Sequence, residues 1–291
     1  MSLFESPGKY EDVFADFSRP PAVRGRESLW LQDDLPVPRA VLFDVYDTLV
    51  RSTIGDLEEQ RRRKSDSSSF VDTALRFGFN SEIGARWHTL FFDYIEEEHS
   101  RCRRLGIMRA EVLVERIWDR ILKETVPERS RFEEDARKIG LYRELKANPV
   151  AHFEGVLELW SFLNREKILV GLVTNAQYYT LPVLSWVLNV NLADYLTPQI
   201  VICSYALGYA KPDPYFFRYV ETQIRRLGLE SRHVWVVGND PENDMAAAKP
   251  YGFTTVLFTG SSSDAKSADA DASAGSFFDL KKLIQRFLKG G

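Results

Sequence analysis

Cysteine and histidine are scarce in this chain. Its 291 residues include two cysteines, Cys102 and Cys203, and four histidines. Two cysteines are too few for a framework of disulfide bonds, and neither residue type shows the spacing of zinc ligands. We therefore expect a reducing compartment, the cytoplasm, and no zinc site.

Long apolar runs and an excess of one charge are also missing. No run approaches the roughly 18 apolar residues of a membrane span, and the first residues lack the basic and apolar regions of a signal peptide. The 38 Lys and Arg residues nearly balance the 42 Asp and Glu residues, which gives a net charge of -4. We expect neither a membrane nor a nucleic acid as partner. Composition leaves the oligomeric state open.

What remains is an ordinary globular composition, with 44% hydrophobic and 27% charged residues. At roughly 150 residues per domain, the length suggests two domains or one large domain with an insertion. The pattern of charged and apolar residues also changes along the chain and divides it in the same way. We predict an irregular N-terminal extension over 1–38, an α/β core over 39–55 and 149–291, and a helical cap over 56–148.

The core region alternates short apolar runs with amphipathic segments. Strands are predicted at 40–45, 168–173, 200–203, 233–237 and 254–258, and helices near 154–166, 178–188, 213–227 and 242–250. Strands that alternate with helices of this length indicate a doubly wound parallel sheet. The low-complexity stretch 260–276 predicts a flexible loop. In the insertion, Ile83, Trp87, Leu90 and Phe91 form a helical stripe, so we expect it to be all-helical.

Polar residues follow four of the predicted strands. They are Asp44 to Thr48, Thr174 with Asn175, Lys211, and the segment 238–244. Ligands of open α/β sheets bind beyond the carboxyl ends of the strands, so these groups should converge. Any one of them could merely cap a helix. Together they supply a carboxylate nucleophile, a cation, a hydroxyl group and further carboxylates for a metal ion.

These residues make the sequence resemble the haloacid dehalogenase superfamily of hydrolases. The match covers all four family motifs and brackets a helical insertion where the family carries a cap after its first strand. The resemblance implies a Rossmann-like core with an all-helical cap. The motifs are Phe43-Asp-Val-Tyr-Asp-Thr-Leu49, Val173-Thr-Asn175, Ala210-Lys-Pro-Asp-Pro214 and Val237-Gly-Asn-Asp-Pro-Glu-Asn-Asp-Met245.

The resemblance also implies roles for individual residues. Asp44 would be the nucleophile that forms a covalent aspartyl intermediate. Thr174 would bind the transferring group, and Lys211 would neutralise the charge on nucleophile and substrate. Thr48, which shapes the turn after the nucleophile, Asn175 and Tyr46 would lie on the substrate side. A Mg²⁺ ion, which prefers oxygen ligands, is the expected cofactor, and its candidate ligands are Asp44, the Tyr46 carbonyl, Asn239, Asp240 and Asp244.

Position 46 departs from the phosphatases of the superfamily, which carry there a second Asp that protonates the leaving alcohol. A positioned general acid contributes roughly 10² to 10⁴ in rate, so a phosphatase with Tyr46 should be slow unless another group, of which Asp47 is the nearest, replaces it. The dehalogenases of the superfamily are similar in having Tyr at this place, and a halide leaves without a proton. The acidic residues Asp240, Glu242 and Asp244 instead favour a bound cation and a phosphate substrate.

We therefore expect a Mg²⁺-dependent phosphatase that acts on a small anionic, phosphorylated metabolite. A 2-haloacid dehalogenase-like hydrolase is one alternative, and a ligand-binding protein with little or no turnover is another.

Two details of the expected site stay open at this stage. Either Asn239 or Asp240 could approach the metal, and the charge of Asp240 makes it the better Mg²⁺ ligand. In the cap, which closes over the site in this superfamily, the substrate-side candidates cannot be ranked. They are Arg86, His88, Tyr94 and Arg101, with Gln177, Tyr178 and Tyr179 on the core side.

Overall fold

The computed structural model describes residues 7–31, 35–52, 67–128, 132–260 and 267–290, and the statements below concern these residues. The strands are β1 (Leu29–Leu31), β2 (Ala40–Phe43), β3 (Val50–Ser52), β4 (Val150–His152), β5 (Leu169–Thr174), β6 (Val201–Cys203), β7 (Val234–Gly238), β8 (Thr254–Phe258) and β9 (Ala272–Ala274).

The α-helices both precede strand β4 and lie between or after the later strands. They are α1 (Glu11–Phe14), α3 (Ser68–Arg76), α4 (Ser81–Arg104), α5 (Val114–Thr125), α6 (Phe132–Ala147), α7 (Val156–Arg165), α8 (Thr180–Leu188), α9 (Ser204–Leu207), α10 (Pro214–Arg226) and α11 (Phe277–Gly290). Shorter turns of 3₁₀-helix are η1 (Pro7–Tyr10), η2 (Leu192–Asp194), η3 (Pro198–Ile200), η4 (Ser231–His233) and η6 (Lys249–Tyr251), and η5 (Pro241–Ala246) is a π-helical turn.

One seven-stranded sheet organises the core, in the order β1-β9-β8-β7-β2-β5-β6. All neighbours pair in parallel except β1, which runs antiparallel to β9. This confirms the predicted doubly wound α/β fold. Strand β2 lies between β5 and β7, so the chain winds outward from it in both directions. Such a switch point is where open α/β sheets bind their ligands.

Both faces of the sheet are buried, which explains why its strands are continuous apolar runs. Along β2, Val41 and Phe43 face the larger core cluster, which includes α7, α8 and α11. Ala40 and Leu42 point to the opposite face and pack in a second cluster with α10. Alternate residues of β2 therefore pack against different helical layers on the two faces of the sheet.

Four strands lie outside the predicted set. Strand β1 falls in the segment expected to be irregular, and β9 falls in the stretch expected to be a flexible loop, so the loop prediction is wrong for Ala272–Ala274. Both are only three residues long, and β9 consists of Ala and Ser, which give no strand pattern. Strands β3 and β4 pair antiparallel where the chain leaves the core and returns to it.

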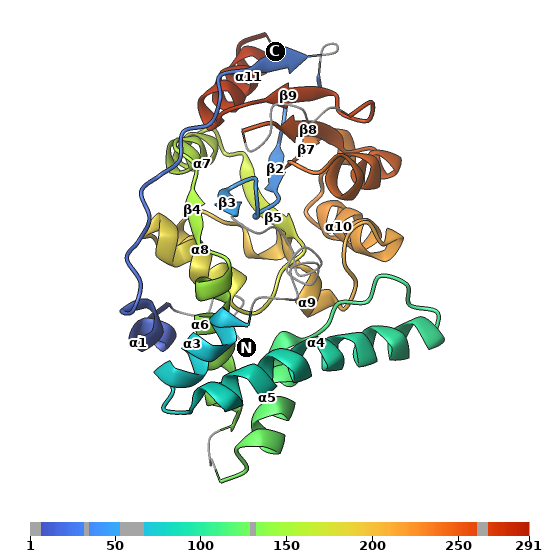
Figure 1. The fold of residues 1–291 in the computed structure, drawn as a ribbon. Coiled ribbons are helices and arrows are strands. Elements are labelled where there is room, and N and C mark those ends of the chain that lie inside the picture. The colour runs from blue at the N-terminus through green and yellow to red at the C-terminus, as the bar shows by residue number, and fades with distance from the viewer. Residues whose placement is uncertain (1–6, 32–34, 53–66, 129–131, 261–266, 291) are drawn as a thin grey trace.

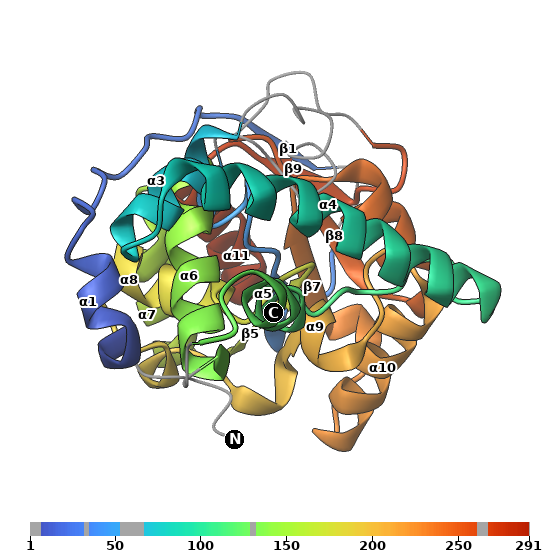
Figure 2. The ribbon, with the colours of Figure 1, turned by 60° about the horizontal axis from the view of Figure 1, so that its bottom comes forward.

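The described part of the insertion consists of helices α3 to α6, which pack around buried aromatic residues such as Trp87 and Trp118, and its helical character agrees with the prediction. Figure 1 shows these helices below the sheet, and Figure 2, turned to view that end, shows the long helix α4 crossing in front of it. The predicted boundary at residue 56 lies outside the described residues, and the division into domains stays a prediction.

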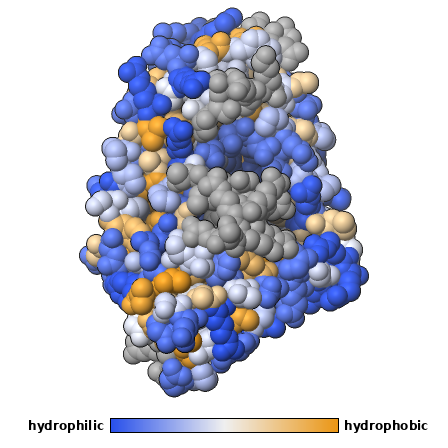
Figure 3. All heavy atoms as spheres, in the orientation of Figure 1, coloured by the Kyte–Doolittle hydropathy of each residue, from blue (hydrophilic) through white to orange (hydrophobic). Residues whose placement is uncertain are grey.

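Few large apolar side chains among the described residues are exposed. Figure 3 shows hydrophilic residues over most of one face, with hydrophobic residues in small separate patches. None of the described helices combines the length and the apolar character needed to cross a bilayer. Both cysteines are free, and Cys203 is buried at the end of β6.

Candidate active site

A buried lysine joins two carboxylates at the carboxyl edge of the sheet. The Lys211 ammonium donates to Asp44 Oδ1 at 2.8 Å and to the Val173 carbonyl oxygen at 3.0 Å, and it also bonds to Asp244 Oδ1. The exposed fractions of the Lys211, Asp44 and Asp244 side chains are 3%, 10% and 1%. Three residues that are far apart in sequence therefore meet at one point, as the predicted sheet edge requires.

The electrostatics of this group follow from its burial. Burial opposes the charge of Lys211, but Asp244 and Asp44 outweigh it and raise the pKa of the ammonium. Burial, with the nearby charge of Asp44, raises the pKa of Asp244 to about 6 despite the attraction of Lys211. One cation between two carboxylates leaves an excess of negative charge in a place that water hardly reaches.

Asn175 fixes the main chain of Lys211. Its side-chain Nδ2 donates to the Lys211 carbonyl oxygen at 3.0 Å, and its Oδ1 accepts from the Lys211 backbone N–H at 2.7 Å. The neighbouring Thr174 is fully buried, and its hydroxyl donates to the Asn175 carbonyl oxygen over a long 3.4 Å. Asn175 reaches the pocket described below, whereas Thr174 lies beneath it.

The turn after β2 positions Tyr46 and Thr48. Asp47 adopts a left-handed backbone with φ 57°, and its carboxylate accepts from the Ser52 backbone N–H at 3.0 Å. Asp47 is thereby committed to the turn. The buried Thr48 hydroxyl donates to Asn239 Oδ1 at 3.2 Å, which ties this turn to the loop after β7. Of the two, Tyr46 lines the pocket and Thr48 does not.

Asp240 and Asp244, two of the three acidic residues after β7, make different contacts. Asp240 Oδ1 accepts from the backbone N–H groups of Glu242 and Asn243 at 2.8 and 2.9 Å, so Asp240 caps η5. Asp244 turns back toward the sheet, and its Oδ2 accepts from the Asp240 backbone N–H at 3.1 Å. Gly238 makes room for it, since a Cβ at that position would overlap the Asp244 carboxylate.

The two candidate metal ligands of this loop, Asn239 and Asp240, make different contacts. Both oxygens of Asp240 are engaged within its own turn, because Oδ2 also accepts from Asn243 Nδ2 at 2.7 Å. Asn239 Oδ1 instead faces Thr48, in the turn that carries Tyr46. Which of the two approaches a metal stays a prediction, and the charge of Asp240 did not by itself indicate that this residue caps a helical turn.

The donors at the sheet edge fit a hard cation in kind. Asp44, Asp244, Asn239 and the Tyr46 carbonyl supply oxygen ligands, and the excess negative charge around Lys211 suits a divalent ion. Within the described ranges, no three His, Cys, Asp or Glu side chains form a ready metal-holding cluster. A Mg²⁺ ion would thus depend on water or substrate oxygens for its remaining ligands.

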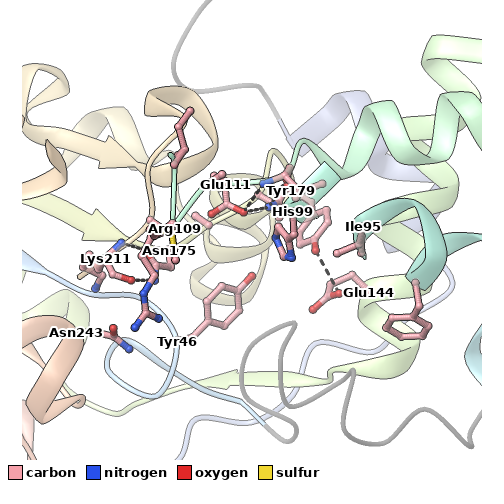
Figure 4. A pocket seen from close by; sticks show the side chains of 18 of the residues that line it. Tyr46, Ile95, His99, Arg109, Glu111, Glu144, Asn175, Tyr179, Lys211 and Asn243 are labelled. Atoms are coloured by element: carbon pink, nitrogen blue, oxygen red, sulfur yellow. Dashed lines mark hydrogen bonds between the residues drawn. The ribbon is translucent and has the colours of Figure 1, made fainter. Parts of the chain in front are cut away.

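A cavity of about 360 Å³ lies between the core and the cap, above the Lys211 ammonium. Figure 4 shows the ring of Tyr46 near its middle, with Arg109, Asn175, Lys211 and Asn243 on one side and Ile95 with Glu144 on the other. Its size suits a small metabolite. The lining comes from α4 (Phe92, Ile95, His99, Arg103), the following loop (Ile107 to Val112), α6 (Glu144, Asn148), and the core (Tyr46, Asn175, Ala176, Gln177, Tyr179, Ala210, Lys211, Asn243).

The polar wall around Tyr46 is a linked network. The Tyr46 hydroxyl is 3.1 Å from Thr180 Oγ1, and the Tyr179 hydroxyl donates to Glu144 Oε2 at 3.3 Å. Burial and the charge of Glu144 raise the pKa of Tyr46, so this hydroxyl keeps its proton throughout the neutral range. Tyr46 can donate a hydrogen bond to a substrate but is a weak acid.

The four cap residues suggested from the sequence have other contacts. Arg86 and Tyr94 both bond to Glu124, Arg101 pairs with Glu98, and His88 packs against aromatic rings. None of them lines the cavity. The cap residues that do include Arg109, Glu111 and Glu144, which the sequence analysis missed. The only sequence signal for Arg109 and Glu111 is their place in the break between two helical patterns.

Comparison with known proteins assigns the chain to a family. The haloacid dehalogenase-like hydrolase family model matches residues 38–252, so the chain belongs to this family of hydrolases. No curated protein matches the chain in sequence.

Among solved structures, the chain is similar to a 2-haloacid dehalogenase from Pseudomonas syringae pv. tomato DC3000, with a TM-score of 0.55, 21% identity and coverage of 86% of this chain and 99% of that one. It is also similar to a HAD phosphatase from Thermococcus onnurineus, with a TM-score of 0.50, 21% identity and coverage of 84% and 97%. At this identity the likeness shows the fold alone, and the fold is common to both reactions.

Proposed function

We propose that the chain is a Mg²⁺-dependent phosphatase of small phosphorylated metabolites, with Asp44 as its covalent nucleophile. The observation that carries this proposal is the Asp44–Lys211–Asp244 group, of which Lys211 lines the cavity and holds the two carboxylates next to it. Lys211 holds Oδ1 of Asp44, while Oδ2 accepts no hydrogen bond from the residues that the structure describes. One carboxylate oxygen is oriented by a cation, and the other is left to attack.

The reaction would proceed in two displacements. Asp44 attacks phosphorus, the bond to the ester oxygen breaks, and the alcohol leaves with the electron pair and takes up a proton. Water then attacks the aspartyl phosphate, which releases phosphate and restores the Asp44 carboxylate. A bound Mg²⁺ would neutralise charge on the phosphoryl group. Thr174 and Asn175 would support that group from the end of β5, and Lys211 would offset its charge.

The leaving alcohol needs a proton, and neither Tyr46 nor Asp47 is well placed to supply it. Tyr46 occupies the place of the expected acid, its hydroxyl is 3.1 Å from Thr180 Oγ1, and its pKa is raised by burial. Asp47 is held by Ser52. We therefore expect slow turnover of alkyl phosphates and faster turnover of esters whose leaving group needs no proton.

The weak acidity of Tyr46 favours a second candidate reaction, the hydrolysis of a carbon–halogen bond by Asp44. A halide leaves as an anion and needs no proton, so Tyr46 would not slow this reaction. In addition, Asp240 accepts hydrogen bonds within its own turn, so fewer carboxylates face the site than the sequence suggests. The third candidate, a binding protein with little turnover, predicts ligand binding without product release. The expected location in the cytoplasm stays a prediction.

One set of assays separates the three. Purified protein is given p-nitrophenyl phosphate with and without Mg²⁺, ethyl phosphate, and 2-chloropropionate, with Asp44→Asn as the control. Mg²⁺-dependent phosphate release that Asp44→Asn abolishes is the expected result. Chloride release that EDTA leaves intact would replace the phosphatase with the dehalogenase. Binding of substrate without either product would support the third candidate.

Tyr46→Asp, included in the same assays, tests the missing acid. It should raise turnover of ethyl phosphate by about 100-fold and that of p-nitrophenyl phosphate much less, because only the alkoxide needs a proton. An equal change for both esters would show that protonation does not limit the rate.

A further inference from the structure

The loop between α4 and α5 is fastened to the core beside Lys211. The Arg109 carbonyl oxygen accepts from the Ala210 backbone N–H at 3.0 Å, and the Glu111 backbone N–H donates to the Gly208 carbonyl oxygen at 3.2 Å. Between them, Ala110 forms an antiparallel bridge with Tyr209. A residue of the cap, Arg109, is thereby held next to the segment that ends in Lys211.

Two core side chains hold the same loop from beneath. The buried Gln177 side chain donates from Nε2 to Glu111 Oε1 at 2.8 Å and to the Val112 carbonyl oxygen at 2.9 Å. Its Oε1 accepts from the Val114 backbone N–H at 3.2 Å, at the start of α5. Ser204 also donates to Glu111, from the N-terminus of α9. The backbone position of Arg109 is therefore set by the core.

The Arg109 guanidinium is nevertheless available to a ligand. Its side chain lines the cavity and is 54% exposed, and among the described residues its nearest carboxylate, that of Glu242, is 4.0 Å away, beyond hydrogen-bond distance. The other cations of the lining differ, since Lys211 is saturated and Arg103 donates to Glu96 at 2.6 Å. Figure 4 shows Arg109 on the side of Tyr46 that also carries Lys211 and Asn243.

The carboxylates that line the cavity do not compete for Arg109. Glu111 is bonded to Gln177 and Ser204, and Glu144 accepts from Asn148 and Tyr179. The rest of the wall on this side is uncharged, with Asn175 and Asn243. A guanidinium group presents a planar fork of donors that matches a carboxylate in two parallel hydrogen bonds.

We propose that Arg109 binds a carboxylate of the substrate, so that the substrate carries this group in addition to the phosphate at Asp44. The inference rests on the proposed function for the position of the phosphate. Arg109 sets specificity, and Lys211 and Asp44 perform the reaction. The cavity of about 360 Å³ limits the link between the two groups to a short one.

The test compares two esters that differ only in this group, 2-phosphoglycolate and ethyl phosphate. Arg109→Gln should raise the KM for 2-phosphoglycolate about 10- to 100-fold and change that for ethyl phosphate less than about threefold. Arg109→Lys, which keeps the charge and loses the fork, should fall between. Arg101→Gln, on the outer surface of α4 and paired with Glu98, is the matched control and should change neither KM.

Binding to an Asp44→Asn background makes the test independent of turnover. Calorimetric titration there should show that 2-phosphoglycolate binds more tightly than ethyl phosphate, and that Arg109→Gln removes this difference. Equal effects on both esters, no effect on either, or no binding of 2-phosphoglycolate would overturn the proposal. Hydrolysis of both esters that is insensitive to Arg109→Gln would leave the phosphatase intact and remove only the carboxylate site.

Discussion

The floor of the cavity and the wall built by the cap hold their positive charges in different ways. Lys211, at the floor, is 3% exposed and is surrounded by three acceptors from the core. Arg109, in the wall, is 54% exposed, and its nearest carboxylate in the part of the chain that the structure describes is 4.0 Å away. Both backbones are fixed by hydrogen bonds, so the difference lies in the side chains.

This difference matches two kinds of task. A reacting carboxylate benefits from a partner that keeps the same geometry before and after substrate arrives, because no reorganisation is then needed during the reaction. A recognition group must exchange water for substrate, and a charge already saturated by the protein gains nothing from a ligand. We therefore infer that the floor serves chemistry and the wall serves selection.

Replacing Lys211 should have the largest effect. Lys211→Met leaves Asp44 and Asp244 buried together without a cation, and removal of one partner from a buried ion pair costs about 3 to 5 kcal/mol. We expect the free energy of unfolding, measured by urea denaturation, to fall by this amount. Adding Asp244→Asn to the variant should recover part of it.

Lys138→Met is the matched control, because Lys138 also lies between two carboxylates, Asp12 at 3.0 Å and Glu134 at 3.5 Å. Its side chain is partly exposed, so the loss should stay below about 1 kcal/mol. Similar losses for the two lysines would mean that burial does not distinguish the floor from the surface.

The floor was also the part that the sequence could predict. Asp44 follows β2 directly, and Lys211 and Asp244 lie in the segments that follow β6 and β7. The parallel strands of an α/β sheet end at one edge, so these three residues were expected to lie close together. The five core strands were found for the same reason, since burial on both faces makes them continuous apolar runs. Asp240 shows what the sequence could not predict, because its charge does not indicate that it accepts hydrogen bonds from the backbone N–H groups of Glu242 and Asn243.

The wall could not be predicted, because its placement depends on tertiary contacts. Arg109 lies in a loop, and only the bridge between Ala110 and Tyr209 brings it over the site. A helical stripe on α4 identifies a buried face but does not say which of its ends meets the core, so Arg86 and Arg101 were as plausible as Arg109. Strand β9 was missed because Ala and Ser carry no periodic signal.

Loosening the contact between wall and core should have an intermediate effect. Gln177→Leu removes three hydrogen bonds to the loop and to the start of α5. Leaving buried polar groups unpaired costs about 1 to 3 kcal/mol. Hydrogen exchange should accelerate at the Val112 and Val114 amides, while strands β2 and β7 keep their protection.

Gln223→Leu on α10 is the control for this variant, since Gln223 Nε2 is buried and has no hydrogen-bond partner among the described residues. We expect stability to be unchanged or slightly higher. If Gln177→Leu accelerated exchange across the whole sheet, the side chain would support the fold as a unit, and the separation between floor and wall would be lost.

Removing the charge of Glu242 should have the smallest effect and bears most directly on the comparison. The pair with Arg109 is long and exposed, so Glu242→Gln should change the free energy of unfolding by less than about 0.5 kcal/mol. It also removes an anion that competes for Arg109, so the KM for 2-phosphoglycolate should fall two- to threefold at low salt, and about 0.5 M NaCl should abolish the gain by screening.

Glu230→Gln, which removes the glutamate paired with Arg232, is the control and should leave this KM unchanged. A higher KM in Glu242→Gln would mean that Glu242 holds the guanidinium in place, and Arg109 would then resemble Lys211 more than its exposure suggests.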